Sequence, residues 1–274
     1  MNLFLAAIVT LGATVVTTTA MLLVRKRAPD GSYFSDGDRA SGVFGVLATG
    51  FSVLLGFIIF LAFTSYDQSR SGAESEATIV VQQVETAQFM PEESRSDLTG
   101  ELVCYARSVV GNEWSALDAG TLGDAINPWG AAMYHTLRSV APKTYAQQSA
   151  YDRWTDQTAD REQARSDRIH GAEGIIPLPL WLVLFLISGV IFVYMLFFAD
   201  VGERAATQAL LMASVTIVIT VLLGLLVFFN HPHGDEVGKL QPTAMERTLR
   251  QIDAELDVAG LDLQAPCDGN GTAL

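Results

Sequence analysis

Four uninterrupted apolar blocks, each long enough to cross a membrane as a helix, constrain what this chain can fold into. A hydrocarbon core about 30 Å thick needs roughly 20 apolar helical residues. The blocks cover residues 3–24, 43–64, 176–199 and 207–229, and none contains Asp, Glu, Lys, Arg or His. A soluble domain would distribute its apolar residues over short periodic runs, so this pattern predicts a membrane protein. The first block is followed by basic residues instead of a small-residue cleavage site, so we expect it to be retained.

Helical periodicity continues in the polar region between the second and third blocks. It predicts one helix that ends at Pro91, a second that breaks at Gly111, a third from Pro128 to Pro142 and a fourth over residues 145–170. The fourth helix is polar nearly all round, so we expect it to touch its neighbours over a narrow strip.

The tail after the last block predicts one more amphipathic helix, with Gly260 as its C-cap. No segment of the sequence has a pattern that predicts a β-strand. We therefore predict an all-α membrane protein with four transmembrane helices and a helical extramembrane domain between spans two and three. Its predicted parts are a first helix pair (1–64), the helical domain (65–174), a second helix pair (175–230) and the tail (231–274).

No enzyme, cofactor or nucleic-acid site is predicted. The sequence has no nucleophile elbow, no phosphate-binding glycine loop and no zinc-protease motif. A net charge of −13 argues against nucleic acid, which requires a basic surface. Cys104 and Cys267 do not form a C-x-x-C pair, and we expect two reduced thiols, with a disulfide only if their side of the membrane is oxidising.

The stretch HPHGDE follows directly on the fourth block and leaves two alternatives open. His231, His233, Asp235 and Glu236 are possible metal ligands, but ligands so close in one loop rarely converge on one ion. The other interpretation, which we favour, is a polar collar where the chain leaves the membrane, in which the histidines respond weakly to pH. No metal site is therefore predicted.

This stretch also carries a family resemblance. Pro232-x-Gly234-Asp235-Glu236, followed by a leucine–proline step and an amphipathic helix, resembles the end of bestrophins. The similarity runs over about residues 42–256 and looks closest to the bacterial bestrophin-like branch. Further short motifs, in the same order, are Gly56-Phe57, Ser65-Tyr66, Glu76-Ala77, Leu102-x-x-Tyr105-Ala106, Glu113-Trp114 and Leu178-Pro179-x-Trp181.

The resemblance implies a homopentameric channel for small inorganic anions, in which the second span lines the pore. By spacing from Tyr66, the narrow neck would fall at Ser52, Gly56 and Phe60, which lie one turn apart on one face. Only Phe60 is large and apolar, so a hydrophobic gate would be a single ring. The alternative is that this face is a small-residue seam for close helix packing. His233 stands where the family usually has Phe, and calcium regulation is not carried over.

Arg161, Arg165 and Arg168 lie on one face of the predicted helix before the third span. They could attract anions towards a pore. The alternative, which we favour, is that they form ion pairs with acidic residues, either neighbours such as Asp160, Glu162 and Asp167 or Glu76 and Glu85 on the adjoining helix.

Sidedness and function class remain the open questions. Positive-inside counting favours a cytoplasmic first loop, because that loop carries Arg25, Lys26, Arg27 and Arg39. The family resemblance instead implies cytoplasmic termini and a cytoplasmic helical domain, and we expect that topology in a multi-pass protein of the cell membrane. The function classes are an oligomeric anion channel and a non-conducting, membrane-anchored interaction or scaffold protein.

Overall fold

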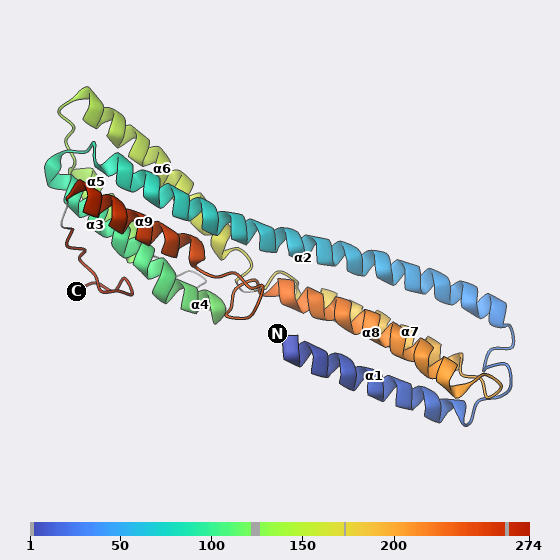
Figure 1. The fold of residues 1–274 in the computed structure, drawn as a ribbon. Helices are drawn as coiled ribbons and strands as arrows, with labels where there is room; N and C mark the ends of the chain where they lie inside the picture. Colours follow the sequence, from blue (N-terminus) through green and yellow to red (C-terminus); the bar gives the residue numbers. More distant parts are fainter. Residues whose placement is uncertain (1–2, 122–126, 173, 261–262) are drawn as a thin grey trace. The chain divides into compact units, whose positions relative to one another are not determined.

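The computed structural model describes residues 3–121, 127–172, 174–260 and 263–274, and their regular structure is helical (Figure 1). No strand occurs among these residues, apart from two isolated bridges. In chain order the elements are α1 (Leu3–Arg25), α2 (Gly37–Ala87), α3 (Glu92–Ser108), the π-helix η1 (Val109–Glu113), α4 (Trp114–Asp118), α5 (Pro128–Ser139), α6 (Tyr145–Ile169), α7 (Leu178–Phe197), α8 (Ala205–Asn230) and α9 (Thr243–Ala259). The predicted all-α membrane fold is confirmed.

The chain forms two compact units. The first, which we call the membrane unit, comprises Met1–Thr64 and Gly174–Asn230. The second, the helical domain, comprises Ser65–Glu173 and His231–Leu274, so the tail belongs to the same unit as the polar region. Four helices of the described chain are long and apolar enough to cross a membrane: α1, α2, α7 and α8.

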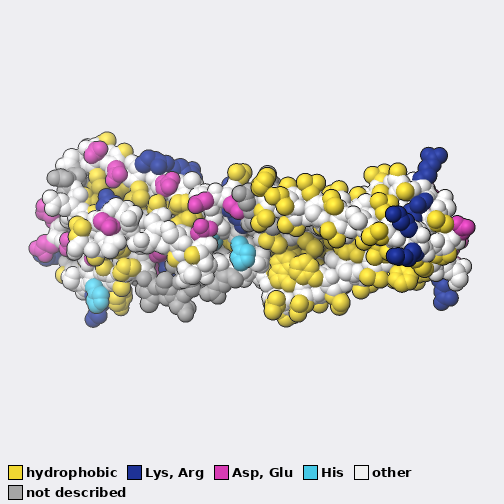
Figure 2. All heavy atoms as spheres, turned by 90° about the horizontal axis from the view of Figure 1, so that it is seen from below, with side chains coloured by type: hydrophobic (Ala, Val, Ile, Leu, Met, Phe, Trp, Pro, Cys, Tyr) yellow, Lys and Arg dark blue, Asp and Glu magenta, His cyan; other side chains and the backbone are white. Residues whose placement is uncertain are grey.

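Within the membrane unit, α2 buries one face against α7 and α8. This apolar cluster contains Phe51, Leu55, Ile58 and Ala62 from α2, Leu184 and Ile191 from α7, and Ile219 and Leu226 from α8. Helix α1 packs along α8, where the hydroxyls of Thr17 and Thr216 are hydrogen-bonded at 2.8 Å. Many large apolar side chains face outward, and Figure 2 shows them gathered over the visible face of this unit. That surface suits lipid.

The helical domain is built around α3, which is buried on nearly every side. Leu98, Leu102, Tyr105 and Val109 are completely buried, in a cluster with residues of α2, α5 and α9. The buried residues of α6 form one strip, which confirms the narrow contact predicted for this helix: Ala150, Trp154, Gln157, Arg161, Ala164 and Arg168. Gly260 caps α9 in the left-handed conformation, as predicted.

Two predicted helix boundaries were wrong. The second span and the first polar helix are one 51-residue helix, α2, because no Gly or Pro interrupts the helical pattern where the apolar residues end. Gly111 does not break the second polar helix. The chain continues through η1 into α4, and Gly111 lies against the backbone of Asn270 in the tail.

Candidate functional site

The predicted pore-neck residues lie on the face of α2 opposite its buried face. Ser52, Gly56 and Phe60 are exposed, and the side chain of Phe60 is 62% accessible. Val53 and Phe57 on the same side are also exposed, at 69% and 59%. In a single chain this face contacts neither α7 nor α8, so only lipid, another subunit or a pore can cover it.

The small residues of this face make no close helix contact within the chain. A Cβ atom added at Gly45 or Gly56 would meet nothing within 4 Å. The Ser52 hydroxyl donates to the carbonyl of Ala48 at 2.8 Å, so its hydrogen-bonding need is met by its own helix. A small-residue seam here can therefore serve only an intermolecular contact.

A buried cluster of charges in the helical domain contains two of the three candidate arginines. Arg168 on α6 lies between two carboxylates: it binds Glu76 of α2 through two donors, and its Nη2 reaches Glu113 Oε2 at 2.5 Å. The other carboxylate oxygen of Glu113, Oε1, lies 3.5 Å from Nη2 of Arg165. The side-chain amide of Asn127 donates to this same oxygen at 2.6 Å. All of these groups are buried or nearly so.

The charges in this cluster stabilise one another. Burial raises the pKa of Glu113, but Arg168 and Arg165 outweigh it and hold that pKa below its usual value. Burial would lower the pKa of Arg168, yet Glu76 and Glu113 raise it well above the ordinary value. Both shifts favour the charged forms of Glu113 and Arg168.

Arg161 is also buried, with 1% of its surface accessible. It donates to Gln83 Oε1 at 2.7 Å, reaches Glu162 at 3.2 Å and lies 4.8 Å above the ring of Tyr105. Arg161, Arg165 and Arg168 thus form ion pairs and hydrogen bonds inside the domain, as in the alternative considered from the sequence.

Glu113 is the residue of this cluster that sequence reasoning did not assign. A signal was present: Glu113 lies one turn after Val109 and one turn before Leu117, on an apolar helical face. Glu76 likewise falls in register with Ala73 and Val80. A carboxylate on the buried face of a helix requires a partner, and the only question was which one.

The HPHGDE stretch forms a closed turn. Leu240 N donates to the carbonyl of Pro232 at 2.9 Å, and Gly234 has a φ of +142°, which favours glycine. Tyr66 and Trp114 donate to the carbonyls of Gly238 and Leu240 and fix the turn to the helical domain. In this turn Asp235 is exposed and Glu236 is half-buried.

The histidines of the turn differ from the expected pH-sensitive collar. His233 is buried edge-on against Trp114, with ring centroids 5.6 Å apart, and burial together with the charge of Arg168 lowers its pKa to about 4. Partial burial and Lys239 also lower the pKa of His231. The pKa of each imidazole is therefore shifted below that of a free histidine side chain, about 6.5. Among the described residues, no group of three His, Cys, Asp or Glu side chains could hold a metal ion.

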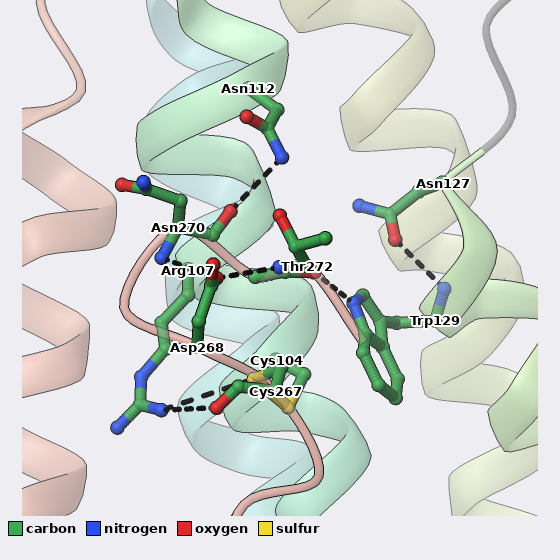
Figure 3. The surroundings of a disulfide bond; sticks show 10 residues. Cys104, Arg107, Asn112, Asn127, Trp129, Cys267, Asp268, Asn270 and Thr272 are labelled. Carbon is green, nitrogen blue, oxygen red and sulfur yellow. Dashed lines mark hydrogen bonds between the residues drawn. A yellow bond between two sulfur atoms is a disulfide. The ribbon is translucent and has the colours of Figure 1, made fainter. Parts of the chain in front are cut away.

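The prediction of two reduced thiols was wrong. Cys104 of α3 and Cys267 of the tail form a disulfide, although 163 residues separate them in sequence. Figure 3 shows the tail folded over the end of α3, where Trp129 Nε1 donates to the carbonyl of Gly271 at 2.6 Å. Sequence spacing could not reveal this pair, because only the docked tail brings the two residues together.

Comparisons with known proteins agree with this fold. The family profile described as a Bestrophin-like domain matches residues 8–243. A crystal structure of a bacterial bestrophin homologue from Klebsiella pneumoniae superposes with a TM-score of 0.67 at 13% identity, covering 95% of this chain and 100% of the other. A single-substitution variant of that homologue gives 0.63 at 12% identity, covering 92% and 99%. No curated protein sequence matches this chain significantly.

Proposed function

The chain belongs to the bestrophin-like family, and we propose that it assembles into an oligomeric anion channel, with α2 of each subunit lining the pore. The proposal describes a multi-pass protein of the cell membrane that transports ions and carries out no enzymatic reaction. Five copies around one axis is the arrangement that the family resemblance implies.

The exposed face of α2 is the observation that carries this proposal. A helix that lies only in lipid would carry large apolar residues on its outer face, whereas this face alternates Ser52 and Gly56 with Val53, Phe57 and Phe60. Small residues allow close approach between subunits or a wide lumen, and rings of Phe side chains can gate a pore by dewetting. We assign the neck to Ser52, Gly56 and Phe60, with Phe60 as the single hydrophobic ring.

The three arginines have no part in the proposed conduction. Arg161 and Arg168 are buried, and they and Arg165 neutralise carboxylates of their own domain. We therefore expect selectivity for anions to depend on the pore itself and on the assembly, and not on an arginine-lined vestibule.

Chloride flux from liposomes tests this function directly. Purified protein should release chloride from loaded vesicles, and Phe60→Ala should increase the rate by widening and wetting the neck. A homo-oligomer that passes no anion, with or without Phe60→Ala, would support the non-conducting scaffold instead.

Cysteine accessibility tests which residues line the pore. A charged thiol reagent should block the flux of Ser52→Cys, because its side chain would face the water-filled lumen. Leu186→Cys on the exposed face of α7 is the matched control, since Leu186 is 68% accessible but would face lipid. If the reagent blocked the flux of both variants equally, or blocked the flux of neither, the assignment of α2 to the pore would be wrong.

A further inference from the structure

The disulfide bears on which side of the membrane the helical domain occupies. Cys104 is completely buried and Cys267 is 5% accessible, so the bond lies inside the folded domain. The tail around it is held by other contacts as well: Asn112 donates to the carbonyl of Asn270 at 3.2 Å, and the indole of Trp129 binds Gly271. The two sulfur atoms are therefore brought together by a built binding site for the tail, visible in Figure 3.

Disulfides of this kind form and persist in oxidising compartments and are rare in the cytosol. Two thiols become one disulfide when two electrons and two protons pass to an oxidant, which outside the cytosol is the disulfide of an oxidoreductase. The pairing of Cys104 with Cys267 thus favours a non-cytoplasmic helical domain.

The charges on the two short loops of the membrane unit favour the same orientation. The α1–α2 and α7–α8 loops meet at one end of this unit: Tyr33 N donates to the carbonyl of Phe197, and Gly31 N donates to Asp200 Oδ1 at 3.0 Å. Figure 2 shows Lys and Arg side chains gathered at this end. The basic residues of the two short loops and their edges are Arg25, Lys26, Arg27, Arg39 and Arg204.

Short loops rich in Lys and Arg remain in the cytoplasm, whereas long polar segments count little in that rule. The basic residues of the helical domain that lie closest in sequence to the spans, among them Arg70, Arg165 and Arg168, belong to a long polar segment and therefore add little to this bias. We therefore propose that the two loops face the cytoplasm and that the helical domain, closed by the Cys104–Cys267 disulfide, lies on the oxidising side of the membrane. This orientation is opposite to the one expected from the family resemblance, and it does not depend on conduction.

Thiol trapping of the unmodified protein tests the disulfide. Cells are quenched in acid, and the denatured chain is treated with a polymer-linked maleimide before or after reduction. We expect no addition before reduction and two additions after it. Two additions without reduction would overturn the proposal.

Single added cysteines test the orientation while Cys104 and Cys267 remain bonded. Ser149→Cys lies on the exposed side of α6, and Ser35→Cys is exposed in the α1–α2 loop. A membrane-impermeant maleimide should label Ser149→Cys in intact spheroplasts and Ser35→Cys only after lysis. The reverse pattern, or labelling of both before lysis, would overturn the proposed orientation even if the disulfide is present.

Discussion

The guanidinium of Arg168 donates two hydrogen bonds to the carboxylate of Glu76, so that α6 and the part of α2 in the helical domain are joined by a buried ion pair. Gly72, one turn before Glu76 on α2, has no space for a side chain because the backbone of α6 at Ala164 and Arg168 lies against it. The close helix approach brings the charges within reach, and the charges in turn fix the register of the two helices.

Removing one partner of this pair should strongly destabilise the domain. Glu76→Gln leaves Arg168 with one carboxylate in a buried site, and loss of one member of a buried pair costs about 3–5 kcal/mol. Denaturant unfolding of the detergent-solubilised protein, followed by tryptophan fluorescence, measures this cost. The control is Glu74→Gln, which breaks the exposed Arg70–Glu74 pair at 3.3 Å and should cost under about 1 kcal/mol. Similar small losses in both variants would mean that the buried pair contributes little.

His233 should make the stability of the protein depend on pH in the mildly acidic range. Burial first, and then the charge of Arg168, lowers the pKa of this imidazole from 6.5 to about 4 in the folded protein. As the pH falls from 6.5 towards 4, the unfolded chain gains a proton that the folded chain does not. Stability is then lost in this window, by up to about 3 kcal/mol.

Replacing His233 with Phe should remove this pH dependence. The Phe side chain retains a ring against Trp114 and cannot be protonated, so the unfolding midpoint should vary less between pH 6.5 and 4 than in the native protein. His135→Asn, at an exposed position of α5, is the control and should retain the native profile. An unaltered profile in His233→Phe would assign the effect to other groups.

Much of this fold could be predicted from the sequence, because apolar length and helical spacing are local properties. The four spans, the α6 strip and the Gly260 cap all follow from residues within a few turns of one another. The continuity of α2 could have been predicted too, since no Pro occurs between Thr64 and the end of the helix at Ala87.

The disulfide and the pairing of Arg168 with Glu113 could not be predicted in the same way. Arg168 pairs with Glu113 instead of with an acidic neighbour on its own helix, and Cys104 is bonded to Cys267 in the tail. Both contacts depend on how elements distant in sequence pack. The sequence shows only that a buried Glu needs a cation and not which one supplies it.

The docking of the tail against α3 should make the protein sensitive to substitution of Gly271. Its φ of +77° favours glycine, and an added Cβ would overlap the backbone of Ser108. Gly271→Ala should therefore lower stability by more than about 1 kcal/mol. Gly269→Ala is the matched control: nothing lies within 4 Å of its Cβ position, so its effect should stay within about 0.5 kcal/mol. Thermal unfolding of both variants decides this, and equal midpoints would mean that the tail is not tightly docked.

Assembly through α2 can be separated from folding of the single chain at Gly56. A side chain at this position meets nothing within 4 Å inside the chain, so Gly56→Leu should leave the subunit folded. If neighbouring subunits approach closely along this face, the added isobutyl group should prevent their contact, and the particle in detergent should fall to a smaller mass. Gly189→Leu on α7 is the matched control, because Gly189 is also exposed and has equal space within the chain. Mass measurement by light scattering should then show an intact oligomer for Gly189→Leu and a smaller particle for Gly56→Leu. A full-size particle for Gly56→Leu would contradict packing through this seam.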